Sequence, residues 1–474
     1  MTLPAKFVER VLRDLGGTEG AALCAALDAE PPVSVRLNPA KTGADTLPAG
    51  PDAGLPVPEA AGLPALAIAG RVPWSRDGRY LAVRPSFTLD PDFHAGAYYV
   101  QEASSQFVGH LLAAVRTEGA RILDLCAAPG GKTTLYASLA GPDGLVVANE
   151  IDRRRASVLA DNVHKWGTGN VAVTTCEPRA LGDFEAWFDV VAVDAPCSGE
   201  GMFRKDPDAR GEWSEGNVKQ CAARQDEILR EAWRALRPGG TLVYSTCTFN
   251  RDEDEGALER MAAWAGDEIA ESEETAVEDA WGIVCGRVGA FRTFRFYPHR
   301  TCGEGFFAAV ARKSFDAGGR VRAPKARRTV FAAVDRKTAG ELARWVRNPG
   351  GMRFAAVADT CYAWYAAQAD AVRTLSEALP VIYSGVALGQ VFKGVLKPDP
   401  ALAFFDGLNR EALPAAELDD EETLRFLRRQ DIAAGGLAEG MNLVCSRGRA
   451  LGFAKRIGAR VNNLYPNSLR IIKQ

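Results

Sequence analysis

Apolar runs of strand length alternate with helical segments through the middle of the chain. The runs cover residues 121–126, 145–150, 171–175, 188–195 and 241–247, and helical spacing appears between them over 153–167 and 221–240. Buried apolar strands separated by helices specify a parallel sheet with helices on both faces. We therefore predict an α/β, Rossmann-like domain. A further apolar run at 306–313 predicts a late strand that closes the edge of this sheet.

The flanking sequence predicts additional units. A chain of 474 residues is long enough for two to four domains. The glycine-rich, basic stretch DAGGRVRAPKARR, residues 316–328, is typical of a domain boundary. We expect an N-terminal α+β region over 1–110, the α/β domain over 111–315, a basic linker with a small accessory domain over 316–390, and a second accessory domain over 391–474.

Composition indicates a cytoplasmic globular protein. Apolar residues make up 47% of the chain and charged residues 25%, and no apolar run reaches the length of a membrane span. The first twenty residues lack the apolar core of a secretory signal. The ten cysteines form no CxxC pair or dense framework, so we expect free thiols in a reducing compartment, no metal site and no membrane association.

Positive charge is concentrated near the C-terminus. Residues 320–353 hold ten Lys or Arg against two acids, and the last 29 residues hold seven Lys or Arg and no acid. Such segments are often solvated surface, but they also permit a polyanionic partner such as RNA.

The stretch DLCAAPGGKTT, residues 124–134, ends like a phosphate-binding P-loop. A P-loop requires Gly where this chain has Cys126, and Pro129 has no N–H to offer a phosphate. The sequence therefore argues against an ATPase.

The same loop favours a different nucleoside ligand. It follows the first strand of the predicted sheet, and ligands of open α/β sheets bind at the carboxyl ends of the strands. Small residues let a ligand approach the backbone, the next helix offers N–H groups to a carboxylate, and Glu150 is placed to bind ribose hydroxyls. Arg155 could support cofactor binding through Glu150 or Asp152, although an arginine exposed on a helix is the more usual case. S-adenosylmethionine fits these features, although the loop alone would also suit another Rossmann-like enzyme.

Two cysteines follow later strands of the same sheet. Asp194 and Cys197 lie in VDAPCSGEGM and Cys247 lies in YSTCTF, so all three are expected in one crevice. Carbon 5 of a pyrimidine becomes nucleophilic when a thiolate adds to carbon 6, which gives a methyltransferase a use for thiols. Asp194 and Lys132 are candidates to orient the base and stabilise the adduct.

The three motifs DLCAAPGGKTT, VDAPCSGEGM and YSTCTF resemble those of the Nop/Sun family of S-adenosylmethionine-dependent RNA 5-methylcytosine methyltransferases. The resemblance implies that Cys247 is the nucleophile and that Cys197 assists release of the methylated RNA. It implies cofactor contacts from Glu150, Asp194, Glu177 near the adenine, and the loop residues Cys126, Ala127, Ala128, Pro129, Gly130, Gly131 and Lys132.

Both ends of the chain extend the resemblance. SVRLNPAKT and AGAYYVQEASSQFVG are similar to the family's N-terminal RNA-binding region, and GFAKRIGARVNNLYPNSLR resembles the C-terminal PUA-like module of bacterial RsmF-type enzymes. These enzymes methylate a cytosine of 16S ribosomal RNA, so the resemblance implies this partner for a protein that we expect to be monomeric.

Three alternatives stay open at this stage. The same chemistry could act on tRNA or another ribosomal RNA, Cys197 could be the nucleophile as in DNA cytosine-5 methyltransferases, or the chain could be a catalytically silent ribosome-assembly factor. In the tail, Lys455, Arg456 and Arg460 could contact RNA or only solvent, and Tyr465 could stack on a base or belong to the core.

Overall fold

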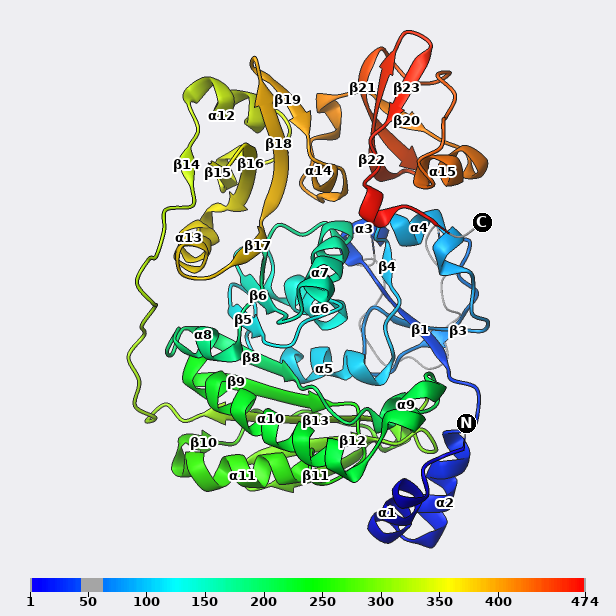
Figure 1. Cartoon of the computed structure of the whole chain (residues 1–474), viewed down its shortest axis with the longest axis vertical. Coiled ribbons are helices and arrows are strands. Elements are labelled where there is room, and N and C mark those ends of the chain that lie inside the picture. The colour runs from blue at the N-terminus through cyan, green and yellow to red at the C-terminus, as the bar shows by residue number, and fades with distance from the viewer. Residues whose placement is uncertain (1, 44–62, 473–474) are drawn as a thin grey trace.

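The computed structural model describes residues 2–43 and 63–472, which form four β-sheets with their helices (Figure 1). The N-terminal unit begins with a helical hairpin and continues into an antiparallel sheet of order β2-β3-β1-β4. Its elements are α1 (Ala5–Leu15), α2 (Gly17–Ala26), β1 (Val33–Leu37), α3 (Pro39–Thr42), β2 (Ile68–Arg71), β3 (Gly78–Leu81), α4 (Pro91–His94) and β4 (Tyr98–Tyr99).

The central unit contains the predicted parallel strands. Their order is β7-β6-β5-β8-β9. Strands β6 and β7 are added on one side of β5, and the chain then crosses back to add β8 and β9 on the other side. The α/β prediction is confirmed. The elements are α5 (Phe107–Ala113), β5 (Arg121–Asp124), α6 (Gly131–Ala140), β6 (Leu145–Asn149), α7 (Arg153–Trp166), β7 (Val171–Thr174), α8 (Pro178–Gly182), β8 (Phe188–Asp194), α9 (Pro207–Glu212), α10 (Glu215–Ala235) and β9 (Leu236–Thr246).

The sheet extends beyond the parallel strands at both edges. The late strand does not close the sheet, because β13 (Phe306–Lys313) pairs with β9 on one side and β12 (Phe291–Phe296) on the other, followed by β11 (Val284–Val288). Helix α11 (Glu255–Ala265) and the short β10 (Ile269–Ala270) precede these strands. At the opposite edge, β17 (Val381–Ser384) pairs with β7, so a distant segment covers that strand.

The helical prediction over 221–240 is too long. Helix α10 ends at Ala235 and β9 begins at Leu236. Pro238 and the positive φ of Gly239 (73°) are incompatible with a continuing helix.

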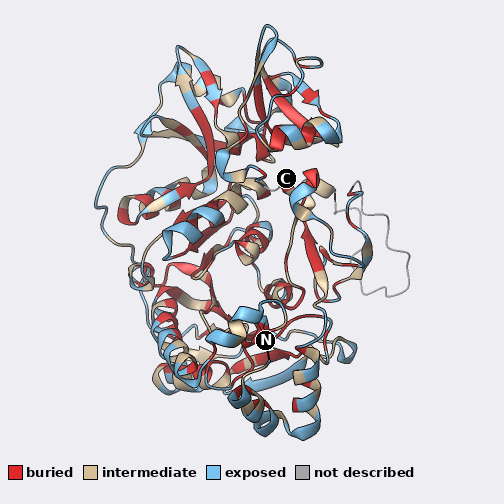
Figure 2. Ribbon diagram, turned by 45° about the vertical axis from the view of Figure 1, so that its right-hand side comes forward, coloured by how far each residue is buried: buried red, intermediate tan, exposed pale blue. Residues whose placement is uncertain are grey.

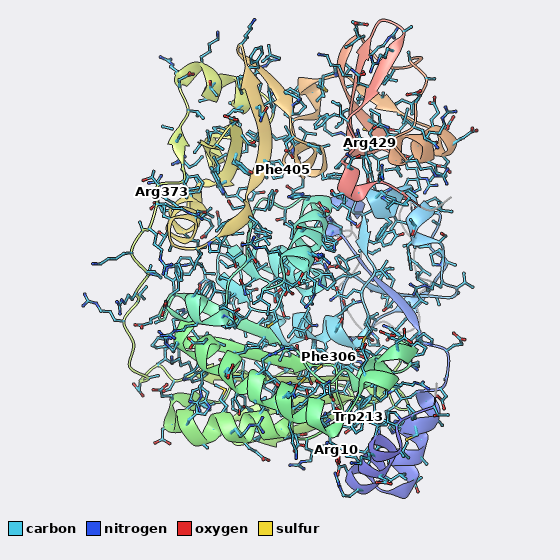
Figure 3. The ribbon with its side chains drawn as sticks, viewed as in Figure 1. Arg10, Trp213, Phe306, Arg373, Phe405 and Arg429 are labelled. Carbon is cyan, nitrogen blue, oxygen red and sulfur yellow. The ribbon has the colours of Figure 1, made fainter. Side chains whose placement is uncertain are left out.

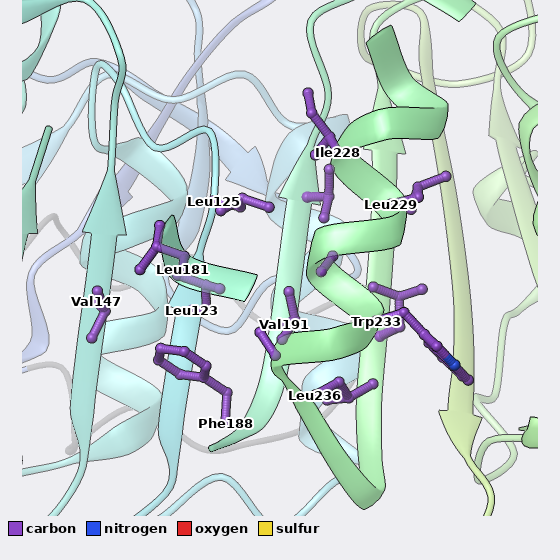
Figure 4. Packing of buried hydrophobic residues seen from close by; sticks show 14 of the residues in the cluster. Leu123, Leu125, Val147, Leu181, Phe188, Val191, Ile228, Leu229, Trp233 and Leu236 are labelled. Carbon is purple, nitrogen blue, oxygen red and sulfur yellow. The ribbon is translucent and has the colours of Figure 1, made fainter. Parts of the chain in front are cut away.

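Alternating side chains of the central strands bury both faces of the sheet. Leu123 and Val191 pack with α10, while Ile122 and Val190 pack with the α5–α7 side. Leu229 and Trp233 of α10 lie over β8 and β9 (Figure 4). The strands are therefore buried almost throughout, whereas the linker near residue 320 is exposed (Figure 2).

The C-terminal half forms two further sheets. The first has the order β14-β15-β16-β18-β19 and the second β20-β21-β22-β23. Strand β18 crosses the boundary expected at residues 390–391, so residues through Pro398 belong with the preceding unit. The elements are β14 (Ala332–Ala333), α12 (Arg336–Ala343), β15 (Met352–Val357), β16 (Thr360–Tyr365), α13 (Ala369–Ala378), β18 (Val386–Phe392), β19 (Val395–Pro398), α14 (Pro400–Phe404), β20 (Ala415–Glu417), α15 (Asp420–Leu427), β21 (Gly440–Ser446), β22 (Arg449–Ile457) and β23 (Arg460–Asn463).

The last sheet docks on the N-terminal unit. Arg449 lies 2.8 Å from the buried carboxylate of Asp92, and Arg447 contacts the same carboxylate at 2.8 Å. Tyr465 is completely buried and packs edge-on against Phe426, so it belongs to the core and is not a stacking surface.

Candidate functional site

The site lies at the carboxyl ends of the parallel strands. The loops after β5, β6, β8 and β9 meet there, next to the point between β5 and β8 where the strand order reverses. This is the position where open α/β sheets bind ligands.

Two thiols face each other across this edge. Cys197 follows β8 and Cys247 follows β9, and their sulfur atoms lie 3.2 Å apart. The hydrogen bond with Cys247 raises the pKa of Cys197 well above its usual range, and burial and the charge of Glu253 add to the shift. The structure therefore brings the two predicted cysteines into direct contact.

An ion pair of Lys132 and Asp194 belongs to the same site. Lys132 Nζ lies 2.8 Å from Asp194 Oδ2, and the Ser245 hydroxyl donates to Asp194 Oδ1 at 2.8 Å. Burial would lower the pKa of Lys132, but the charge and hydrogen bond of Asp194, together with the charge of Asp124, outweigh burial and the pKa is raised. Lys132 is thus a charged donor, and it also lies 5.2 Å from the ring centre of Phe306, which Figure 3 labels.

The loop over residues 126–132 is held by contacts to its backbone. Gly130 has a φ of 110°, and a Cβ there would lie 3.0 Å from Leu159. The Pro129 carbonyl accepts from Asn162 Nδ2 at 2.8 Å and the Ala128 carbonyl from Arg155 Nη2 at 3.1 Å. Side chains of other elements thus fix the loop, with Ala127 buried and Cys126 half-buried between them.

The acidic residue after β6 is held in place. Glu150 is 4% exposed, accepts the N–H of Asp152 at 3.0 Å and lies 3.3 Å from Arg155 Nη1. Glu177 is exposed at the start of α8, after the neighbouring strand β7. The hydrogen bonds of the described residues leave Glu177 unconnected to the other candidates.

Asp124 was not among the sequence candidates, although it stands in the quoted motif. Thr133 donates to its Oδ2 at 2.6 Å, while Oδ1 is buried without a hydrogen-bond partner within the described chain. Burial raises the pKa of Asp124 to about 7. A free buried acceptor beneath the loop, the small side chains of the loop and the acidic Glu150 together fit an adenosyl amino acid such as S-adenosylmethionine.

Arg36 links the N-terminal sheet to the cofactor loop. Its guanidinium is buried and donates to the Gly131 carbonyl at 3.0 Å, to Thr134 Oγ1 at 2.6 Å and to Gln101 Oε1 at 2.7 Å. The stretch SVRLNP contains this arginine, but its partners could be identified only once the fold placed β1 beside α6.

Two further basic side chains, Lys205 after the Cys197 loop and Arg456 in the tail, make contacts within the chain. Lys205 lies 3.8 Å from Glu304, and Arg456 donates to the Leu437 carbonyl at 2.6 Å. Over residues 2–43 and 63–472, no group of His, Cys, Asp and Glu has the arrangement of a metal site, and no helix is long and apolar enough to cross a membrane.

Family comparisons match the same three parts of the chain. Residues 3–103 match the N-terminal domain of 16S rRNA methyltransferase RsmF, residues 111–312 match the 16S rRNA methyltransferase RsmB/F family, and residues 414–471 match the RsmF PUA domain. Ribosomal RNA small subunit methyltransferase F of Escherichia coli O127:H6 is 33% identical over 425 residues, covering 84% of each chain. The chain belongs to the RsmF family.

Other relatives agree with this assignment. The Shewanella loihica protein of the same name is 31% identical over 418 residues, with 84% of this chain and 83% of its own length covered. A methyltransferase homolog from Pyrococcus horikoshii has a similar structure, with a TM-score of 0.53 and 27% identity over 65% of this chain and 94% of its own. As an RsmF-family member the protein is an S-adenosylmethionine-dependent RNA methyltransferase with a PUA domain.

Proposed function

We propose that this RsmF-family protein methylates carbon 5 of a cytosine in 16S ribosomal RNA, with Cys247 as nucleophile and Cys197 as the group that releases the product. The 3.2 Å contact between the two thiols, beside the Lys132–Asp194 pair, carries the proposal. Two thiols at that distance can act in turn on one pyrimidine ring, but they cannot serve two separate substrates.

The proposed reaction runs through a temporary bond between Cys247 and carbon 6 of the base. Cys247 sulfur adds to carbon 6 of the base, and the electron pair of the carbon 5–carbon 6 double bond becomes available at carbon 5. Bound S-adenosylmethionine would supply the methyl group that carbon 5 accepts, and its methyl–sulfur bond would break so that S-adenosylhomocysteine leaves with the electron pair on sulfur. Carbon 5 then loses its proton to a base, the sulfur–carbon 6 bond breaks, and the double bond is restored.

The surroundings of Cys197 suit it to the second half of the reaction. The pKa of Cys197 is raised by its hydrogen bond with Cys247, by burial and by Glu253, which keeps Cys197 protonated. A thiol that stays protonated is a poor nucleophile and a good hydrogen-bond donor. Cys197 is therefore suited to assist the second half of the reaction.

Lys132 and Asp194 are suited to hold the base. Ser245 fixes Asp194 from one side and Lys132 from the other, so the carboxylate has a defined direction. A charged donor and acceptor in a half-buried site stabilise the charge that develops on the ring. The target cytosine must leave its stack to reach them, which requires an unpaired or flipped nucleotide.

The relatives are named as small-subunit ribosomal RNA methyltransferases, which supports this RNA as substrate, and the matches at both ends of the chain support RNA binding. The test is transfer of labelled methyl to small ribosomal subunits that lack the modification, with naked 16S RNA, 23S RNA and tRNA compared. Nuclease digestion and mass spectrometry should find 5-methylcytidine at one position of 16S RNA. Label in 23S RNA or tRNA alone would overturn the substrate, and a different methylated nucleoside would overturn the chemistry.

A further inference from the structure

Two buried carboxylates join the loop that carries Cys197 to the segment that carries Cys247. Glu200 follows Cys197 and is 1% exposed, and Glu253 follows Cys247 and is 0% exposed. We call them the crossed carboxylates, because each accepts hydrogen bonds from the opposite segment. Within the described chain neither has a Lys or Arg partner in an ion pair.

Glu200 binds the segment after β9. Its Oε2 accepts from the Thr248 hydroxyl at 2.7 Å and from the Phe249 N–H at 2.9 Å. Its Oε1 accepts from Asn250 Nδ2 at 3.1 Å and from the Trp213 indole at 3.0 Å. Thr248 is the residue directly after Cys247, so Glu200 fixes the nucleophile segment from the Cys197 side.

Glu253 makes the reverse connection. Its Oε2 accepts from the Ser198 N–H at 2.9 Å and from Gln225 Nε2 at 3.0 Å, and its Oε1 accepts from Asn250 Nδ2 at 2.7 Å. Gln225 Nε2 also donates to the carbonyl of Pro196 at 3.0 Å. The residues on both sides of Cys197 are therefore tied to the Cys247 segment.

We infer that Glu200 and Glu253 are positioning residues that set the relative placement of the two cysteines. Removing two carboxylates from water without cationic partners is costly, and a hydrophobic filler would suffice for packing alone. Seven hydrogen bonds, donated by the two loops and by Trp213 and Gln225, offset that cost and give each carboxylate a fixed direction. The inference rests on the proposed function for its catalytic meaning, but the thiol geometry can be measured independently.

The N-terminal hairpin supports this network from outside. Phe7 of α1 packs edge-on against Trp213, with ring centres 5.9 Å apart, and the Trp213 indole donates to Glu200. Figure 3 labels Trp213 next to the N-terminal helices. The hairpin thus restricts the side chain that holds Glu200.

The test compares Glu200→Gln and Glu253→Gln with wild type and with Glu268→Gln. Glu268 also accepts an indole N–H, from Trp233 at 2.8 Å, but lies away from both cysteines. In each variant an amide N–H₂ replaces an oxygen that faces donors. We expect single-turnover methyl transfer to fall by about 100-fold in the first two, as expected for misplaced reacting groups, with S-adenosylmethionine affinity unchanged and Glu268→Gln at the wild-type rate.

A second readout needs no RNA. Diamide takes up the two thiol hydrogens when Cys197 and Cys247 form a disulfide, and peptide mapping measures the rate, with Cys197→Ala as the control for assignment. We expect rapid pairing in wild type and in Glu268→Gln, and pairing slowed by about tenfold or more in the two variants. If wild type makes no 5-methylcytidine but these pairing rates hold, the proposed function fails and the positioning role stands.

Wild-type rates of methyl transfer and of pairing in both variants would overturn the inference. If either variant does not fold, Thr248→Val replaces it, because it removes one donor to Glu200 and keeps the size of the side chain. A slower pairing rate in Thr248→Val supports the inference, and an unchanged rate contradicts it.

Discussion

Lys132 Nζ lies 2.8 Å from Asp194 Oδ2, although the two residues follow different strands of the sheet. The contact places one charged donor and one acceptor next to the two thiols. The pair is held further by Ser245, whose hydroxyl donates to the other oxygen of Asp194.

Replacement of this lysine should slow chemistry more than RNA binding. We expect Lys132→Met to lower kcat by about 100-fold, the usual effect of removing one donor from a developing negative charge, and Lys132→Arg to recover part of the loss. Steady-state kinetics with 16S RNA measures kcat and KM separately. Lys219→Met, an exposed lysine of α10, is the control. An equal fall in the rates of Lys132→Met and of the control Lys219→Met would show a general loss of RNA affinity instead.

Arg36 should affect the cofactor although it lies in the N-terminal sheet. Its guanidinium bonds three acceptors at once, including the Gly131 carbonyl at the start of α6, and a lysine cannot reproduce that fork. We expect Arg36→Lys to weaken S-adenosylmethionine binding by about tenfold, or ~1.4 kcal/mol, in calorimetric titration. The exposed Arg84→Lys in the same unit should bind normally. Unchanged S-adenosylmethionine affinity in Arg36→Lys would show that the N-terminal sheet does not support cofactor binding through Arg36.

Asp124 should make the protein less stable as pH rises. Burial raises its pKa from 3.8 to about 7, and the neighbouring Asp194 and Glu150 add to the shift against Thr133 and Lys132. The folded protein therefore binds this proton more tightly than the unfolded chain, and the stabilisation is lost as pH rises from about 4 through 7.

Asp124→Asn removes this titration. Relative to wild type, the variant should gain about 2–3 kcal/mol of stability between pH 5 and pH 8 in urea unfolding. The exposed Asp143→Asn should show the wild-type pH profile. A pH profile in Asp124→Asn that parallels wild type would contradict the raised pKa.

The sequence predicted which strand ends meet at the site. Buried parallel strands are continuous apolar runs, and the motifs stand in the loops directly after these runs. Cys197 and Cys247 could be assigned to one edge from this pattern alone. Their 3.2 Å contact could not, because it depends on how β8 and β9 align.

Other features depend on contacts between distant segments. The crossed carboxylates stand in the quoted motifs and their continuation, but no local pattern shows which donors they meet. The pairing of β17 with β7 joins residues of an accessory unit to the central sheet. The late run at 306–313 lies inside the sheet because β12 pairs with its outer side, which its own composition does not show. Long-range pairing of this kind is specified by packing and not by propensity.

The proposed roles of the two cysteines predict a trapped intermediate. Cys197→Ala should still add Cys247 to the base and accept the methyl group, but it should release the product slowly. Cys247→Ala should form no bond to the RNA.

The most direct test incubates wild type, Cys197→Ala and Cys247→Ala with labelled S-adenosylmethionine and 16S RNA, followed by denaturing electrophoresis. A labelled protein–RNA adduct in Cys197→Ala that maps to Cys247, with none in Cys247→Ala, is the result that we predict. An adduct that persists in Cys247→Ala and maps to Cys197 would reverse the roles and contradict the proposed mechanism.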